Sequence, residues 1–156
     1  VPTDYTDFKA LGDVMADTMK RVGLNVDYIA TDWGTMLQRR TKKDPVDQGG
    51  WSCFITGWAG MDHLNPAGHI AIRGNGNSPS AWPGWCVSPR LEELRNAWFD
   101  APNPAAQKAI CDDIQRQCMV DVPYWPLGQY TQMTACRTSL TGILNGFATF
   151  WNVRRS

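Results

Sequence analysis

An apolar run from Trp51 to Trp58 is followed at once by a loop sequence, Ala59 to Pro66. The run, WSCFITGW, contains aromatic and β-branched residues and has the length of a buried strand. The loop, AGMDHLNP, contains glycine, asparagine and proline, which interrupt regular structure. The change predicts a strand whose carboxyl end opens into a loop, and in open α/β sheets ligands bind at that end.

The end of the run and the loop carry residue types that suit a small-ligand site. Trp58 supplies an indole, Asp62 supplies a carboxylate, and Gly60 and Met61 lie between them. Such a pair suits a ligand with an ammonium group, because the carboxylate neutralises the charge and the indole covers the apolar part. These residues are therefore predicted to bind a ligand, and no catalytic residue is predicted.

Asp62 and the two histidines also have local interpretations. Asp62 can instead cap a short helical turn over Pro66–Ile70, which the sequence by itself favours. His63 and His69 have a spacing that matches no common metal-ligand pattern. Surface histidines are expected at both positions, and neither a metal nor another cofactor is predicted.

Helical and extended patterns alternate in the first half of the chain. Apolar residues recur at helical spacing from about Asp7 to Val22, and Gly23 follows where a left-handed helix stop belongs. Residues 24–29 alternate as a strand, and residues 33–40 form a second helical pattern. Together with the strand described above, this order predicts an α/β fold with a mainly parallel sheet flanked by helices.

The second half predicts a different arrangement of helices. Ser88 and Asn103 are capping residues, and each is followed by a proline that suits the first turn of a helix. They begin helices over about 89–100 and 104–120, and the short link between these makes a helical hairpin. The prolines of segment 122–130 favour an extended edge over a central strand.

Composition limits the classes of function. The chain has 156 residues, enough for one domain with a core, and its 15 basic residues balance 15 acidic ones. The densest basic run is only Arg39–Lys43, so nucleic acid is not expected as a partner. No apolar run approaches the length that crosses a bilayer, so direct membrane insertion is not expected. Val1-Pro2-Thr3 resembles neither a signal peptide nor a natural start, and a longer parent chain is expected.

The five cysteines are odd in number and include no CxxC pair, so neither a zinc site nor a complete disulfide framework is indicated. Buried free thiols and one disulfide are both open interpretations. Cys111 and Cys118 lie on one predicted helix, roughly 10 Å apart, and cannot bond to each other. Cys86 and Cys118 lie equally far from the predicted hairpin turn on antiparallel paths, which makes them the predicted disulfide pair.

Several short motifs follow one another along nearly the whole chain: Gly23-Leu24-Asn25-Val26-Asp27, Asp32-Trp33, Gly49-Gly50-Trp51, Gly57-Trp58 with Asp62 four before Pro66, Pro123 through Tyr130, and Phe150-Trp151-Asn152-Val153-Arg154-Arg155. In this order they resemble the C-terminal part of the family 5 extracellular solute-binding proteins, the dipeptide, oligopeptide and nickel receptors of bacterial ABC importers. The resemblance implies one lobe of a two-lobed, type II-like periplasmic binding protein. Residues 1–134 would form the C-terminal lobe, and residues 135–156 a tail that returns to the other lobe. The apolar residues of this tail, 147–153 in particular, are expected to dock irregularly or to contact other copies.

The resemblance also implies a function, a location and contact residues. It implies the substrate-binding component of an ABC importer, which captures a peptide or another amine-bearing solute in the periplasm and delivers it to membrane permease subunits. Asp62 matches the aspartate that binds the terminal amine in peptide-binding members, and Trp58 lies near the family's indole. Tyr5 approximates a pocket tyrosine of dipeptide binders, and Trp33 lies near the predicted carboxyl end of a strand. Thr3 stands near the place of the arginine that takes a dipeptide's carboxylate, which leaves an amine-bearing solute of another kind open.

Two other classes of function stay as alternatives. A small α/β hydrolase needs a nucleophile and a base, but both histidines fall in one loop and no Gly-x-Ser-x-Gly motif is present. Cys53 with His63 or His69 is the one conceivable pair, and a cysteine in the middle of a strand is a poor nucleophile. A non-catalytic interaction domain is the other alternative, and it does not explain the placement of the tryptophans and Asp62.

Overall fold

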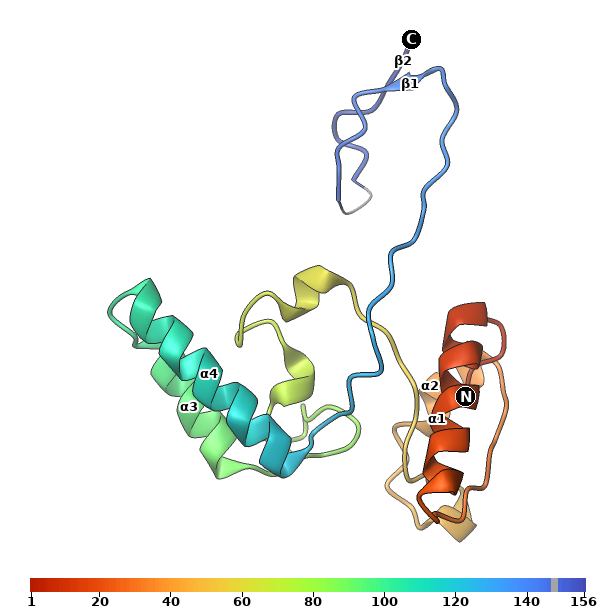
Figure 1. Ribbon diagram of the computed structural model, residues 1–156, viewed down its shortest axis with the longest axis vertical. Helices are drawn as coiled ribbons and strands as arrows, with labels where there is room; N and C mark the ends of the chain where they lie inside the picture. Colours follow the sequence, from red (N-terminus) through yellow and green to blue (C-terminus); the bar gives the residue numbers. More distant parts are fainter. Residues whose placement is uncertain (147–148) are drawn as a thin grey trace.

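The computed structural model describes residues 1–146 and 149–156, and its first half contains two helices (Figure 1). Helix α1 spans Thr6–Arg21 and α2 spans Trp33–Arg39. The stop after α1 is Gly23, whose φ of 90° lies in the left-handed region that glycine adopts without strain. The Asp32 carboxylate caps α2 by accepting a hydrogen bond from the Thr35 N–H at 2.9 Å. Both predicted helices are confirmed to within one residue at each end.

The prediction that segments 24–29 and 51–58 are strands of a sheet is wrong. Both segments lack a strand ladder in the described part of the chain. An isolated parallel bridge joins Pro2 to Thr31, and the Thr3 N–H donates to the Thr31 carbonyl at 2.8 Å. The mainly parallel sheet does not form, because the backbone N–H and C=O groups of a strand need hydrogen-bond partners on a neighbouring strand. Beyond this bridge, the described residues supply no such strand beside either segment. They form a mixture of helices with one two-stranded sheet.

Three short 3₁₀ helices interrupt the irregular middle of the chain. They are η1 (Val46–Gln48), η2 (Gly60–His63) and η3 (Ile70–Ile72). Ile55 and Ile72 are buried aliphatic side chains of this region, at 3% and 5% exposure. The middle of the chain connects the α1–α2 pair to the second half of the molecule (Figure 1).

Helices α3 (Pro89–Phe99) and α4 (Pro104–Asp121) form the helical hairpin that the sequence predicts (Figure 1). Both predicted caps are confirmed, because Ser88 Oγ accepts from a backbone N–H of α3 at 3.1 Å and Asn103 Oδ1 from one of α4 at 2.9 Å. Leu91 is fully buried, which contributes roughly 2 kcal/mol to folding. The core of this half consists of Ile72, Leu91, Leu94 and Ile114.

Beyond Trp125 and Leu127, which lie against α1, the chain runs away from the helices (Figure 1). The tail contains an antiparallel pairing of β1 (Leu140–Thr141) with β2 (Arg154–Arg155). Phe150 and Trp151, between these strands, are 79% and 92% exposed. Phe147, which the sequence analysis placed among the tail's apolar residues, lies outside the described residues. None of the described helices is both long enough and apolar enough to cross a membrane.

Candidate ligand-binding site

Asp62, the carboxylate that the sequence predicts to bind the ligand, also forms a hydrogen bond within the loop after Trp58. Asp62 Oδ2 accepts a hydrogen bond from the Ala59 N–H at 3.0 Å and thereby caps η2. Asp62 thus caps its own turn, not the turn over Pro66–Ile70. It stays exposed, and the nearby Met61 and Leu64 are 62% and 75% exposed. Because a carboxylate can accept several hydrogen bonds, the loop still presents an anion beside two apolar side chains.

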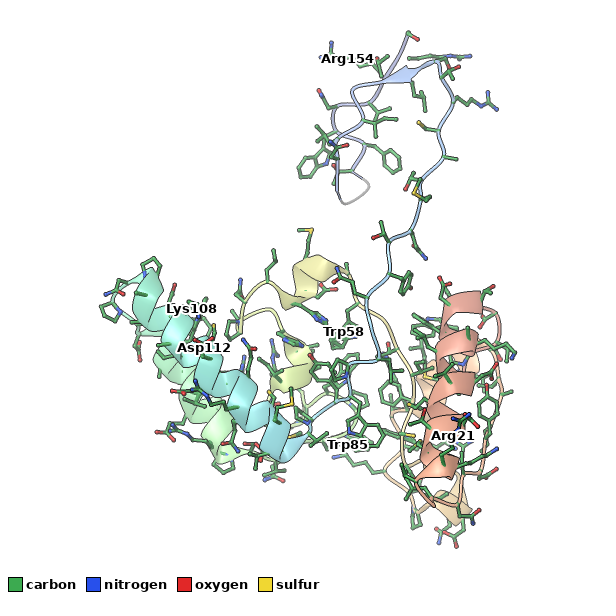
Figure 2. All side chains as sticks on the ribbon, in the orientation of Figure 1. Arg21, Trp58, Trp85, Lys108, Asp112 and Arg154 are labelled. Atoms are coloured by element: carbon green, nitrogen blue, oxygen red, sulfur yellow. The ribbon has the colours of Figure 1, made fainter. Side chains whose placement is uncertain are left out.

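The Trp58 indole packs among aromatic rings from separate segments. Its ring centroid lies 5.5 Å from that of His63 and 4.9 Å from that of Trp82, both in edge-to-face geometry. His63 stacks on His69 with ring centroids 4.3 Å apart, and His69 lies 5.5 Å from Tyr124. We call these five residues the Trp58 cluster. Figure 2 shows Trp58 in the region between the α3–α4 hairpin and the α1–α2 pair.

The Trp58 cluster gives its two histidines different environments. His63 is exposed, whereas His69 is half-buried, and its Nε2 has no hydrogen-bond partner among the described residues. Burial, and then the neighbouring His63 and Arg95, lower the pKa of His69 to about 4, so its imidazole is neutral at pH 7. The expectation of a surface histidine is therefore wrong at position 69. The burial of this ring depends on how the loop folds back, which the spacing of the histidines does not show. Within the described residues, no three His, Cys, Asp or Glu side chains gather as a metal site would need.

A nearly buried cation on α3 holds the segment that carries His69. Arg95 is 8% exposed and donates to the Glu92 carboxylate at 2.8 Å and to the Pro66 carbonyl at 3.2 Å. Glu92 Oε1 also accepts from the Gly74 N–H at 2.8 Å. The two side chains therefore tie both ends of the His69 segment to α3. This helix positions one side of the Trp58 cluster.

The basic run Arg39–Lys43 supports the cluster from another side. The Arg40 guanidinium lies 4.7 Å from the ring centroid of Trp82, and Lys43 Nζ lies 4.9 Å from that of Trp85. Burial also lowers the pKa of Arg40. Figure 2 shows Trp85 below Trp58 in the same central region. No local sequence pattern predicts these contacts, because the cations and their tryptophans lie some forty residues apart in the chain.

Tyr5 and Trp33, the other predicted ligand contacts, form a separate aromatic group with Phe8. Neighbouring ring centroids lie 5.4–5.5 Å apart. The Phe8 ring lies so close to Gly57 that a Cβ atom there would come within 2.7 Å of it, which glycine avoids. This group thus lies beside the residue that precedes Trp58. Among the ring contacts of the described residues, none joins Tyr5 or Trp33 to the Trp58 cluster.

An apolar groove that the sequence did not reveal runs along α1. It has a volume of about 370 Å³ and is lined by side chains of α1 and by Leu24, Trp125 and Leu127. The helical spacing predicted the apolar face of α1, but not that a segment one hundred residues later would lie opposite it. No charged side chain lines the groove, so it offers no counter-charge to an ammonium group. The Asp62 loop is therefore the better candidate for an amine-bearing ligand.

Comparison with known proteins finds a similarity over almost the full chain. No protein-family model matches the chain. The chain is 32% identical over 155 residues to a protein of Sinorhizobium fredii (strain NBRC 101917 / NGR234) named "Probable peptide ABC transporter periplasmic-binding protein y4tO". The alignment covers 99% of this chain and 29% of that relative, so the chain spans less than a third of the relative's length. The relative's name agrees with the general class that the motifs resemble, and it does not specify family 5.

Proposed function

We propose that this chain is part of the substrate-binding component of an ABC importer and captures a peptide or another amine-bearing solute outside the cytoplasm. The observation that carries the proposal is the 32% identity over 155 residues to a relative named as a periplasmic-binding protein of a peptide ABC transporter. The proposal extends to family 5 of the solute-binding proteins, with membrane permease subunits as partners. Two lobes would close on the solute, with residues 1–134 in one lobe and residues 135–156 returning to the other.

The proposed ligand contacts centre on the loop after Trp58. Asp62 would pair with the solute's ammonium group, and the Trp58 indole would cover its apolar part. Gly60 and Met61 would line the approach between them, and Tyr5 and Trp33 would contribute from the group beside Gly57. Two observations support this assignment: Asp62 is exposed, and the nearby His69 is neutral at pH 7 and so does not repel a cation.

The Asp62 assignment is tested by Asp62→Asn in the full-length receptor. Asparagine keeps a side-chain oxygen for the Ala59 N–H, so the turn should persist while the negative charge is lost. Calorimetry with trialanine should show affinity weakened by roughly 2–5 kcal/mol, because a desolvated ammonium group loses its counter-charge. N-acetylated trialanine, which has no ammonium group, should bind both forms equally.

Asp47→Asn is the matched control, since Asp47 is an exposed carboxylate in η1. It should leave the affinity for trialanine unchanged. If Asp62→Asn also leaves it unchanged, Asp62 serves only to cap η2. The transport proposal is tested separately by mass spectrometry of the solute that co-purifies with the receptor. A solute without an amino group would overturn the predicted solute class and leave the role in import standing.

A further inference from the structure

Two cysteines lie on either side of a close contact between the loop before α3 and the end of α4. Ser88 is 4% exposed, and its Oγ donates to Asp121 Oδ2 at 2.6 Å. Cys86 lies two residues before Ser88. Cys118 lies three residues before Asp121, so it projects from the same side of α4 about one turn back. The hydrogen bond therefore brings the two cysteine-bearing segments together.

The surroundings of each cysteine agree with this placement. The Cys86 carbonyl accepts from the Gly76 N–H at 2.7 Å, which holds its backbone in place. Cys86 also lines a small hollow together with Pro123, just beyond the end of α4. Cys118 packs against the core of the α3–α4 hairpin. Both side chains thus lie in the junction between the loop and the helix.

The directions of the pKa shifts of the two thiols agree with this placement. Burial, then Asp121, raises the pKa of Cys86. Burial, then Asp121 and Cys86 itself, raises the pKa of Cys118 to about 11. Each thiol therefore lies near the same carboxylate, and Cys118 lies near Cys86.

We propose that Cys86 and Cys118 form a disulfide when the folded protein meets a disulfide oxidant, although all five cysteines carry free thiols in this structure. One thiolate attacks the oxidant, such as oxidised glutathione, and releases one glutathione thiolate. The second cysteine thiolate then attacks the mixed disulfide and releases the other. The two protein thiols together lose two electrons and two protons, and the oxidant is reduced to two thiols.

This bond goes beyond solute binding, because it would covalently attach the loop to α4. The loop carries Trp82 of the Trp58 cluster and Trp85, which contacts Lys43. A bond at Cys86 would restrain the position of both tryptophans. It would also close the chain over residues 86–118, which lowers the conformational entropy of the unfolded state.

The test exposes the folded 156-residue chain to oxidised glutathione at pH 8.5, alkylates the remaining thiols and maps them by mass spectrometry. The wild type should yield one cross-linked peptide that joins Cys86 to Cys118, whereas the exposed Cys53 and Cys136 should carry either a glutathione or the alkylating group. Cys111→Ser is the matched control, since Cys111 lies on the same helix about 10 Å from Cys118, and it should form the bond as the wild type does. Cys86→Ser and Cys118→Ser should each abolish it.

A second measurement compares the thermal unfolding midpoint with and without reductant. The oxidised wild type and Cys111→Ser should unfold at a higher temperature than their reduced forms, and this difference should vanish in Cys86→Ser and Cys118→Ser. Five alkylated thiols in the oxidised wild type would overturn the proposal. A cross-link that joins a different pair of cysteines would also overturn it.

Discussion

At the scale of single residues, the environment of His69 makes the stability of the fold depend on pH. The ring is half-buried and lies against His63, and its pKa in the folded chain is about 4. In an unfolded chain a histidine titrates near pH 6.5. Between these values the unfolded chain binds more protons than the folded one. The free energy of unfolding therefore contains a contribution that is present above pH 6.5 and is lost as the pH falls towards 4.

We expect the thermal unfolding midpoint of the wild type to fall more steeply between pH 6.5 and pH 4 than that of His69→Gln. Circular dichroism melts at half-unit pH steps would measure both. Carboxylates that titrate in this range act on both proteins, so the difference between the two curves isolates His69. His63→Gln keeps the buried ring and should follow the wild type more closely than His69→Gln does. Parallel curves for the wild type and His69→Gln would contradict the assignment.

At the scale of elements, the Glu92–Arg95 pair attaches an irregular segment to a regular helix. The pair holds the Pro66 carbonyl and the Gly74 N–H, and little of Arg95 reaches solvent. Loss of Arg95 would leave the Pro66 carbonyl without its donor and the Glu92 carboxylate with the Gly74 N–H but without its cation, in a partly buried site. The pair thus links the helical hairpin to the Trp58 cluster.

Arg95→Met should lower the free energy of unfolding by about 2–3 kcal/mol, since it breaks charge-assisted hydrogen bonds of a buried group. Urea denaturation would measure the change. Arg90→Met is the matched control, because Arg90 pairs with Glu93 on the same helix while both side chains are at least half exposed. The control substitution should lower the free energy of unfolding by less than about 1 kcal/mol. If both substitutions lower the free energy of unfolding equally, the attachment to α3 does not contribute to stability.

At the scale of the whole molecule, the tail lies apart from the helices (Figure 1). Its Ile143, Phe150 and Trp151 are 46%, 79% and 92% exposed. Exposed apolar side chains next to short strands favour association, since burial stabilises by roughly 1.5–3 kcal/mol for each large side chain. The charged side chains of the tail are all arginines, namely Arg137, Arg154 and Arg155.

We expect copies of the 156-residue chain to associate through the tail. Multi-angle light scattering should give a mass that rises with concentration, and the double variant Phe150→Ser, Trp151→Ser should shift this rise to higher concentration. Met119→Ser is the control, because Met119 is 78% exposed on α4 and lies outside the tail. A strictly monomeric wild type at every concentration would rule out association through the tail.

The sequence by itself determined the elements that depend on local interactions. Helix α1 follows from apolar residues at helical spacing, whereas α3 and α4 follow from the caps at Ser88 and Asn103, whose side chains bond a backbone N–H three residues away. The left-handed stop at Gly23 is local in the same sense. Each of these features needs only neighbours along the chain.

Only the tertiary structure decided what depends on distant partners. The segment 51–58 has the composition of a strand, yet a strand exists only beside another strand, and the described residues place none there. The lowered pKa of His69 depends on burial by segments from elsewhere in the chain, such as the one that carries Tyr124. Contacts of this kind join residues far apart in the chain, so their energies appear only when the chain is folded, and no local pattern records them.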